Sequence, residues 1–260
     1  MSDIATNPMV FAFGHTRIPV TTPSWDALMN TLRDRLSRRA GFALATINLD
    51  HLVKLRTDAA FREVYAQQDI IVADGNPIVW LSRLAGRPVE LIPGSDLIKP
   101  LAGLAAELGV PVALFGSSQE VLREAADALR QKHPALKIAS QIAPPMGFAP
   151  TGPEAQRMLA EIGASGAGLC LVAMGAPKQE AFAALGRQLV PECGFVSIGA
   201  GLDFLGGTQR RAPKMVRMLA LEWVWRMMSD PRRLALRYLR CALILPGQAV
   251  AALQLRRVRG

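Results

Sequence analysis

Short apolar runs alternate along this chain with longer amphipathic stretches, and this alternation limits the possible folds more than any other feature. Most of the runs are apolar at every position, as parallel strands are when helices cover both faces of their sheet. Strands are expected at residues 10–13, 42–47, 70–73, 110–115, 137–142, 168–173 and 194–198. Helices are expected at residues 24–39, 77–85, 96–108, 119–132, 153–162 and 178–189. The sequence therefore predicts an α/β fold, with a Rossmann-like, mostly parallel sheet and flanking helices.

Several of these elements have boundary signals of their own. Ser118 suits the N-cap of the helix that follows it, Pro153 suits a first helical turn, and Gly109 suits a helix end. Residues 9–20 differ from the rest of the pattern, because they form two short runs around Gly14 and a histidine. We expect a short N-terminal hairpin there.

Cysteine usage and the N-terminal residues indicate the compartment. The chain has three cysteines and no CxxC pair, which argues against a disulfide framework and against a thiolate zinc site. A reducing environment is therefore favoured. The first residues lack the basic region and the long apolar stretch of a signal peptide. Both observations predict a cytoplasmic protein.

The positive charge of the chain is concentrated near its C-terminus. The formal net charge is +9, yet residues 1–209 contain 18 basic and 19 acidic side chains, and residues 210–260 contain 12 basic and 2 acidic ones. We therefore divide the chain into an α/β core, residues 1–208, and a basic amphipathic helical appendage, residues 209–260.

Arginines in the appendage recur at helical spacing. Because Arg226, Arg233, Arg237 and Arg240 are seven, four and three residues apart, they can share one side of consecutive turns, opposite an apolar side. Such a surface suits an anionic bilayer, an acidic protein or nucleic acid, and a solvated helix packed on the core is the remaining alternative. The apolar content favours the bilayer. The apolar run at residues 241–255 is shorter than the roughly 20 residues of a spanning helix, so we expect it in the membrane interface.

Ligands of an open parallel sheet bind outside the carboxyl ends of its strands, and four strand exits here contain polar residues or glycines. The first exit, ATINLDHL, contains Thr46 and Asn48. The second, IIVADGNPIV, places Asp74 and Gly75 directly before a helix. A carboxylate in that position is either a cap of the helix or a general base at the mouth of a cleft, and both interpretations stay open.

The third exit, LVAMGAPKQE, passes through Gly175 into a helix that begins with Lys178 and Gln179. A glycine turn before a helix N-terminus with a lysine suits an anion such as phosphate, although an ordinary tight turn has a similar sequence. The P-loop pattern GxxxxGK[ST] and the dinucleotide pattern GxGxxG are both absent from the chain. Their absence counts against a nicotinamide-dependent oxidoreductase.

The fourth exit, VSIGAGLDFLGG, contains Gly199, Gly201 and Asp203. The glycines permit close backbone approach by a ligand, and the carboxylate can accept hydrogen bonds from a ribose or a base. Each exit alone is weak evidence for a site. Four such exits from apolar strands fit one shared crevice better than four unrelated loops.

In this order along the chain, TINLDHL, ADGNPIV, PGSDL, FGSS, GAPKQE, GAGLDFLGG, RRAP and LEWVWRMMSDPRR resemble the motifs of one family. The chain resembles the WecG/TagA/CpsF bacterial glycosyltransferases of cell-surface polysaccharide synthesis over nearly its whole length. The resemblance implies an inverting transferase that moves a hexose-type sugar from a UDP-sugar to a polyprenyl-diphosphate-linked sugar, with no metal or other cofactor required. N-acetylmannosamine, its uronic acid and glucose are all compatible with it, and the oligomeric state stays open, a homo-oligomer included.

The same resemblance assigns roles to individual residues. It implies that Asp74 is the catalytic base, that Thr46 lies in the same pocket, and that Gln179 and Asp203 lie in the nucleotide-sugar pocket. Asn48, Gly75, Gly175, Lys178, Gly199 and Gly201 belong to the same motifs and are expected to bind substrate. An inverting displacement needs one base and groups that stabilise the departing diphosphate. Arginines of the appendage suit the lipid diphosphate and the membrane surface. We expect the appendage, residues 209–260, to close over the crevice when it docks on lipid and so to complete the active site.

The main alternative from another class is a non-catalytic nucleotide-binding module whose basic tail binds nucleic acid. Nucleic-acid affinity falls steeply with salt, whereas apolar insertion into a bilayer partly survives it, so the two can be distinguished. We expect the enzyme, without a nucleic-acid partner, as a peripheral protein on the inner face of the bacterial cytoplasmic membrane.

Overall fold

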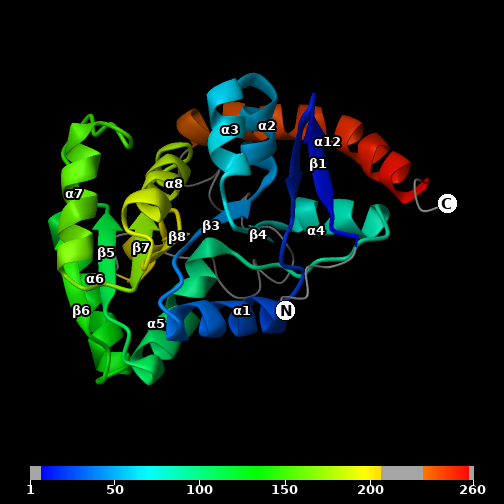
Figure 1. Cartoon of the computed structure of the whole chain (residues 1–260). Coiled ribbons are helices and arrows are strands. Elements are labelled where there is room, and N and C mark those ends of the chain that lie inside the picture. Colours follow the sequence, from blue (N-terminus) through cyan, green and yellow to red (C-terminus); the bar gives the residue numbers. More distant parts are fainter. Residues whose placement is uncertain (1–6, 206–230, 258–260) are drawn as a thin grey trace.

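The protein is built on a parallel sheet of six strands in the order β4-β3-β8-β7-β5-β6 (Figure 1). The computed structural model describes residues 7–205 and 231–257. The strands are β3 (Phe42–Ile47), β4 (Ile70–Ala73), β5 (Val112–Gly116), β6 (Ile138–Ile142), β7 (Leu169–Ala173) and β8 (Gly194–Ser197). All residues of β3, β4, β5, β7 and β8 are buried, as the uniformly apolar runs predict. The predicted α/β class and parallel sheet are confirmed.

Helices cover both faces of this sheet (Figure 1). One face is covered by α1 (Trp25–Ser37), α5 (Gly94–Leu108), α6 (Gln119–Lys132) and the short α9 (Gly201–Leu205). On the other face, α7 (Pro153–Ala164) and α8 (Lys178–Leu189) form one apolar cluster with the sheet. A second cluster on that face joins β3 and β4 to α2 (Leu49–Thr57), α3 (Ala59–Ala66), α4 (Asn76–Leu84) and α12 (Pro231–Arg257).

The predicted boundary signals act as expected. The Ser118 hydroxyl accepts a hydrogen bond from the Val121 amide at the start of α6, and Pro153 occupies the first turn of α7. Gly109 ends α5 with a left-handed φ of 66°, a conformation that glycine adopts without strain. The N-terminal hairpin is also confirmed, as β1 (Val10–Phe13) pairs with β2 (Thr16–Pro19) in antiparallel register.

Two helices between β3 and β4 were not expected from the sequence. The N-cap of α2 is Asn48, whose side chain accepts from the His51 amide while the His51 ring accepts from the Asn48 amide. Asp58 caps α3 in the same way by accepting from the Phe61 amide. Both caps are visible in the sequence as Asn and Asp, but the helices are too short to show a clear 3.6-residue apolar period.

α12 packs on the core instead of standing apart from it. One side of the helix, with Leu234, Cys241, Ile244 and Ala252, is buried, and the helix contacts α2 and α4. Near its end the Arg87 guanidinium donates to the carbonyls of Pro8 and Leu255, at 2.8 and 3.4 Å. The boundary proposed at residues 208 and 209, and Arg226, lie outside the described residues.

The length argument against a membrane span is wrong. The helix continues through Pro246, and its part from Leu234 to Arg257 is long and apolar enough to cross a membrane by length and composition. The side opposite the buried one is apolar and exposed, and consists of Leu236, Leu239, Leu243, Val250 and Leu253. We call these five side chains the outer face of α12.

Candidate active site

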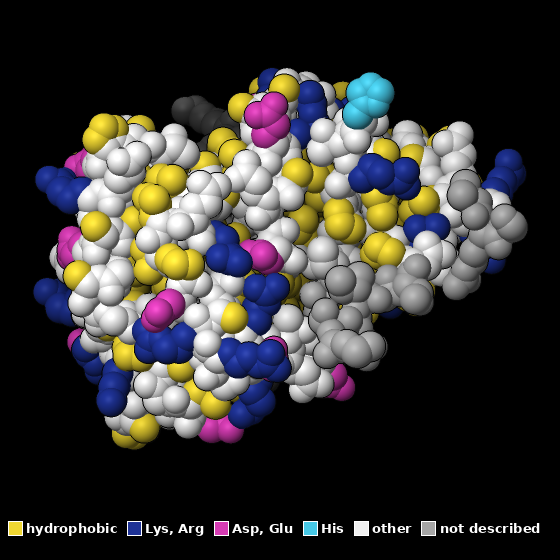
Figure 2. All heavy atoms as spheres, in the orientation of Figure 1, with side chains coloured by type: hydrophobic (Ala, Val, Ile, Leu, Met, Phe, Trp, Pro, Cys, Tyr) yellow, Lys and Arg dark blue, Asp and Glu magenta, His cyan; other side chains and the backbone are white. Residues whose placement is uncertain are grey.

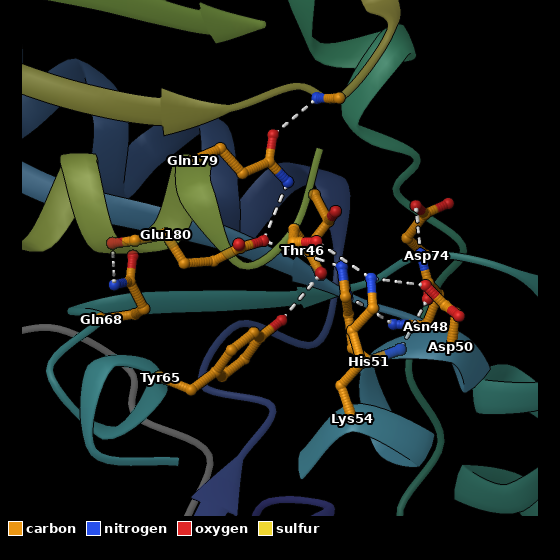
Figure 3. A network of polar contacts seen from close by, with 12 residues as sticks. Thr46, Asn48, Asp50, His51, Lys54, Tyr65, Gln68, Asp74, Gln179 and Glu180 are labelled. Atoms are coloured by element: carbon orange, nitrogen blue, oxygen red, sulfur yellow. Dashed lines mark hydrogen bonds and ion pairs between the residues drawn. The ribbon is translucent and has the colours of Figure 1, made fainter. Parts of the chain in front are cut away.

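The polar strand exits meet at one edge of the sheet. Because all six strands are parallel, the segments after β3, β4, β7 and β8 leave at the same edge. Figure 3 shows the side chains at this edge that form one network of polar contacts, among them Thr46, Asp74 and Gln179. These three were expected in one pocket, and they come from three different strand exits.

Asp74 does not cap the helix that follows it. The N-cap of α4 is Gly75, which has a φ of 98°, and α4 has no side-chain cap hydrogen bond. The Asp74 amide donates to the Ile47 carbonyl at 2.8 Å, which fastens the end of β4 to the end of β3. The Asn48 amide nitrogen Nδ2 lies 3.4 Å from Asp74 Oδ2. The interpretation of Asp74 as the N-cap residue of α4 is therefore wrong, because Gly75 occupies that position.

Thr46 is almost fully buried at the end of β3, with 4% of its surface exposed. Its carbonyl accepts a hydrogen bond from the Tyr65 hydroxyl at 2.8 Å. Burial, together with the charges of Glu180 and Asp74, raises the pKa of Tyr65 well above its ordinary value, so the phenol stays a hydrogen-bond donor. The hydrogen bond from Tyr65 thus connects α3 to the end of β3.

Gln179 connects α8 to the turn after β8. Its Oε1 accepts from the Gly199 amide at 2.9 Å, and its Nε2 donates to Glu180 Oε1 at 2.8 Å (Figure 3). Gly199 has a φ of 58°, and a Cβ added there would meet no atom within 4 Å. The turn therefore has open space beside the position where a nucleotide is expected.

The buried pair of Glu180 and His51 lies beneath these residues. Burial raises the pKa of Glu180 to about 7, although the hydrogen bond from Gln179 opposes the shift. Burial also lowers the pKa of His51 to about 4, with the Lys54 charge acting in the same direction. His51 Nε2 and Glu180 Oε1 are 3.7 Å apart. The contact thus joins a neutral imidazole to a buried carboxyl group and is not a salt bridge at neutral pH.

The turn before α8 is held by two lysines. Lys178 Nζ donates to the Phe148 carbonyl at 2.9 Å, and Lys54 Nζ donates to the Ala176 carbonyl at 3.0 Å. A Cβ added at Gly175 would meet no atom within 4 Å. The N-terminus of α8 has no side-chain cap hydrogen bond, which suits an anion-binding helix end. Lys178 itself is directed at a carbonyl of the neighbouring loop.

Asp203 lies farther along the same edge, on α9. The Ser117 hydroxyl donates to Asp203 Oδ1 at 2.7 Å, and Ser117 directly follows β5. A Cβ added at Gly201 would lie 2.5 Å from Ile98 Cδ1, so the glycine permits α9 to pack closely on α5. Gly201 therefore has a packing reason for its identity, and Asp203 is oriented by a residue of the FGSS motif.

Of the four arginines expected to act together, Arg237 and Arg240 have described side chains. Arg233 lies in α12, but its side chain, like all of Arg226, is outside the described part of the chain. Arg237 Nε is 3.3 Å from Asp50 Oδ1, and Lys54 Nζ is 2.9 Å from Asp50 Oδ2. Burial raises the pKa of Asp50, but the Arg237 and Lys54 charges outweigh this effect and lower the pKa overall. Arg237 thus connects α12 to α2 through Asp50, which lies two residues after Asn48 in the sequence.

Two cavities lie away from this edge. One is lined by residues of α1, α5 and α6, including Arg33, Lys99 and Glu107. The other is lined by the hairpin, α2, α3 and α12, including Arg56 and Arg62. Within residues 7–205 and 231–257, no group of three or more His, Cys, Asp or Glu residues is arranged to hold a metal ion.

Comparison with known families decides the class of this site. The model of the glycosyl transferase WecG/TagA/CpsF family matches residues 15–258, nearly the whole chain. The chain belongs to this family. The match begins in the turn between β1 and β2 and includes both the six-stranded sheet and α12. As a WecG/TagA/CpsF glycosyltransferase, the protein is placed among transferases of surface polysaccharide synthesis.

Several side chains of this glycosyltransferase site were missed in the sequence. Tyr65 comes from α3, a helix that was not expected, and Gln68 lies between α3 and β4. His51 and Lys54 come from α2, which was not expected either. For Glu180, the sequence predicts only a position in the first turn of a helix, at the end of the GAPKQE motif. The signal that could have found two of them is the Asn48 N-cap, because a helix beginning there places His51 and Lys54 on consecutive turns.

The raised pKa of Glu180 leads to a prediction about stability. Because the pKa of Glu180 in the folded protein, about 7, lies above its ordinary value of 4.5, the folded state binds the proton more tightly than the unfolded state does. The tighter proton binding adds to the free energy of unfolding. This contribution is fully present below about pH 4.5 and is lost as the pH rises through about 7. Glu180→Gln has no such loss, so wild type should lose about 3 kcal/mol relative to this variant between pH 5 and pH 8. Urea unfolding at both values of pH measures the difference.

The matched control is Glu63→Gln, because Glu63 is an exposed glutamate on α3. Its unfolding free energy should follow wild type at both values of pH. His51 acts in the opposite direction, since its lowered pKa gives stability that is present above about pH 6.5 and is lost as the pH falls through about 4. A constant difference between wild type and Glu180→Gln across this range would show that Glu180 is not buried as described.

Proposed function

We propose that this glycosyltransferase moves a hexose-type sugar from a UDP-sugar to a polyprenyl-diphosphate-linked sugar, with inversion at the anomeric carbon. The observation that carries the proposal is the position of the Asp74 carboxylate, which contacts Asn48 at the edge of the sheet where the Gln179–Gly199 contact also lies. Family membership supports the reaction class. N-acetylmannosamine, its uronic acid and glucose are the sugars that we consider.

In the proposed reaction Asp74 accepts the proton of the acceptor hydroxyl. The hydroxyl oxygen then forms a bond to the anomeric carbon on the face opposite UDP. The bond from that carbon to the UDP oxygen breaks, and UDP leaves with the electron pair. Asn48, 3.4 Å from the carboxylate, orients it, and Thr46 is proposed to contribute to the same pocket.

The departing UDP is proposed to lie across the ends of β7 and β8. The N-terminus of α8 after Gly175, which has no side-chain cap, stabilises the developing negative charge through the dipole of the helix. Gly199 leaves room for the nucleotide. Asp203, oriented by Ser117, accepts hydrogen bonds from the ribose or the base.

α12 is proposed to bring this site to the membrane. Its outer face presents leucine and valine side chains, Leu243 being 71% exposed, and Arg240 is also exposed. Apolar side chains enter the boundary between headgroups and acyl chains, while arginines bind the anionic headgroups. We therefore place the protein as a peripheral enzyme on the inner face of the cytoplasmic membrane, where Arg237 and Arg240 are near the lipid diphosphate.

The outer face of α12 gives a prediction about membrane binding. Changing Leu239 and Leu243 together to Glu should weaken binding to anionic vesicles by about 10², because each leucine contributes about 1.5–3 kcal/mol when buried. Vesicle flotation measures this. Leu189→Glu is the control, because Leu189 is an exposed leucine on α8, 51% exposed and away from α12. Equal flotation of the double variant and wild type would remove α12 from membrane docking.

Salt distinguishes this surface from a nucleic-acid site. Vesicle binding through the outer face should partly survive high salt, whereas binding to nucleic acid should fall steeply. Figure 2 shows Lys and Arg side chains over α1 and α5 with acidic side chains among them, so this face does not present a uniformly basic surface.

The proposed reaction is tested by UDP release from a panel of UDP-sugars, with and without a short-chain prenyl-diphosphate-sugar acceptor. Release with one donor that depends on the acceptor is the expected result. Binding of UDP without turnover of any donor would instead support a non-catalytic nucleotide-binding module. A product of retained anomeric configuration would contradict the single displacement.

A further inference from the structure

The carboxyl group of Glu180 has no part in the reaction described above, yet its position is costly. It is completely buried between the two apolar clusters on one face of the sheet, and its Oε2 has no hydrogen-bond partner among the described residues. An apolar side chain of similar size would avoid the cost of burying a carboxyl group there. A buried acid that weakens the fold calls for a functional reason.

Glu180 makes one short side-chain contact, and this contact orients Gln179. A carboxamide can present either its oxygen or its nitrogen to a neighbour, and its two ends are exchanged by a half-turn. Glu180 Oε1 accepts from Gln179 Nε2 at 2.8 Å, so the carboxamide oxygen is directed to the Gly199 amide, 2.9 Å away. Without an acceptor at the position of Glu180 Oε1, this orientation loses its support.

Residues of two other segments hold Glu180 in place. Gln68 Nε2, between α3 and β4, donates to the Glu180 carbonyl at 3.1 Å, and His51 Nε2 on α2 lies 3.7 Å from Glu180 Oε1 (Figure 3). His51 Nδ1 accepts from the Asn48 amide, and Asn48 contacts Asp74. The polar contacts therefore continue from the turn after β8 to the carboxylate proposed as base.

We propose that Glu180 is a positioning residue for the nucleotide side of the site: it holds the Gln179 carboxamide in the orientation that fastens the turn after β8 at Gly199. Gln179 is 3% exposed, and both ends of its carboxamide are used within the protein. Its contribution to donor binding is thus made through the shape of the Gly199 turn, with Glu180 acting through it.

The first test measures the turn directly in the full-length protein without substrate. Hydrogen exchange of the Gly199 amide, followed by NMR, should become at least about tenfold faster in both Gln179→Leu and Glu180→Leu. The first variant removes the acceptor of this amide, and the second removes the group that orients the acceptor. Glu180→Gln, which keeps an oxygen acceptor, should exchange like wild type. If Glu180→Leu does not fold, Glu180→Met takes its place. Unchanged exchange in the apolar variant would overturn the inference whatever reaction the protein catalyses.

The second test is kinetic and rests on the proposed sugar transfer. Glu180→Leu should raise the donor KM on the order of tenfold with a much smaller change in kcat, and Glu180→Gln should restore the wild-type KM. The double variant of Gln179→Leu and Glu180→Leu should have the same KM as Gln179→Leu alone, because Glu180 acts through Gln179. Additive effects in the double variant would refute this route. A wild type that turns over no donor would refute the proposed function, while the exchange result would still decide the inference.

Discussion

Asp74→Asn is expected to lower kcat by a factor on the order of 10² or more, while the protein keeps most of its affinity for the donor. The amide cannot accept the proton of the acceptor hydroxyl, so the lost stabilisation of the transition state is about 2.7 kcal/mol or more. The variant should fold normally, because the N-cap residue of α4 is Gly75 and not Asp74. Single-turnover kinetics and UDP calorimetry measure the two quantities separately.

A control for this substitution is Asp26→Asn, which changes an exposed aspartate in the first turn of α1. It should leave kcat and donor affinity at wild-type values. If Asp74→Asn kept the wild-type kcat, Asp74 would have no place in the mechanism. If it instead weakened UDP binding alone, the carboxylate would belong to the donor site and another group would be the base.

Removal of residues 209–260 should leave a folded core with little transferase activity. The truncated chain lacks α12, and with it Arg237, Arg240 and the outer face that we propose to dock on the membrane. The loss should be largest with a lipid-linked acceptor in vesicles, because both docking and diphosphate binding are removed. Full turnover by the truncated protein would refute a role of this region in the reaction.

The structure shows that the truncation has a second effect, which must be measured separately. α12 buries Ile244 and Ala252 against α2 and α4, so its removal exposes apolar surface of the core and should lower the melting temperature. The full-length variant with Arg237→Gln and Arg240→Gln keeps this packing. It should lose activity with the lipid-linked acceptor while melting close to wild type, and Arg256→Gln near the end of the same helix is its control.

The α/β core could be predicted closely from the sequence because local rules and tertiary structure agree there. A strand that is buried on both faces must be apolar throughout, so β3 and β4 were found with their observed bounds. The ends of these strands follow from the same argument, which is why Thr46 and Asp74 could be proposed before their neighbours were known. α2 and α3 were missed because each is about two turns long, and tertiary packing of residues such as Leu52 and Phe61 outweighs their weak periodicity.

The amino-acid sequence by itself determined the family, the strand exits and the residues proposed for the chemistry, since these depend on local pattern and motif order. Only the tertiary structure decided that Gly75 and not Asp74 is the N-cap residue of α4, that α12 packs on the core, and that Glu180 is buried. The physical reason is that the partners are far apart in the sequence. The Glu180 carbonyl accepts a hydrogen bond from Gln68, 112 residues away, and Arg237 near the C-terminus forms an ion pair with Asp50 near the N-terminus. Contacts of this kind leave no periodic trace in the sequence, because they arise only when strand order brings separate helices together.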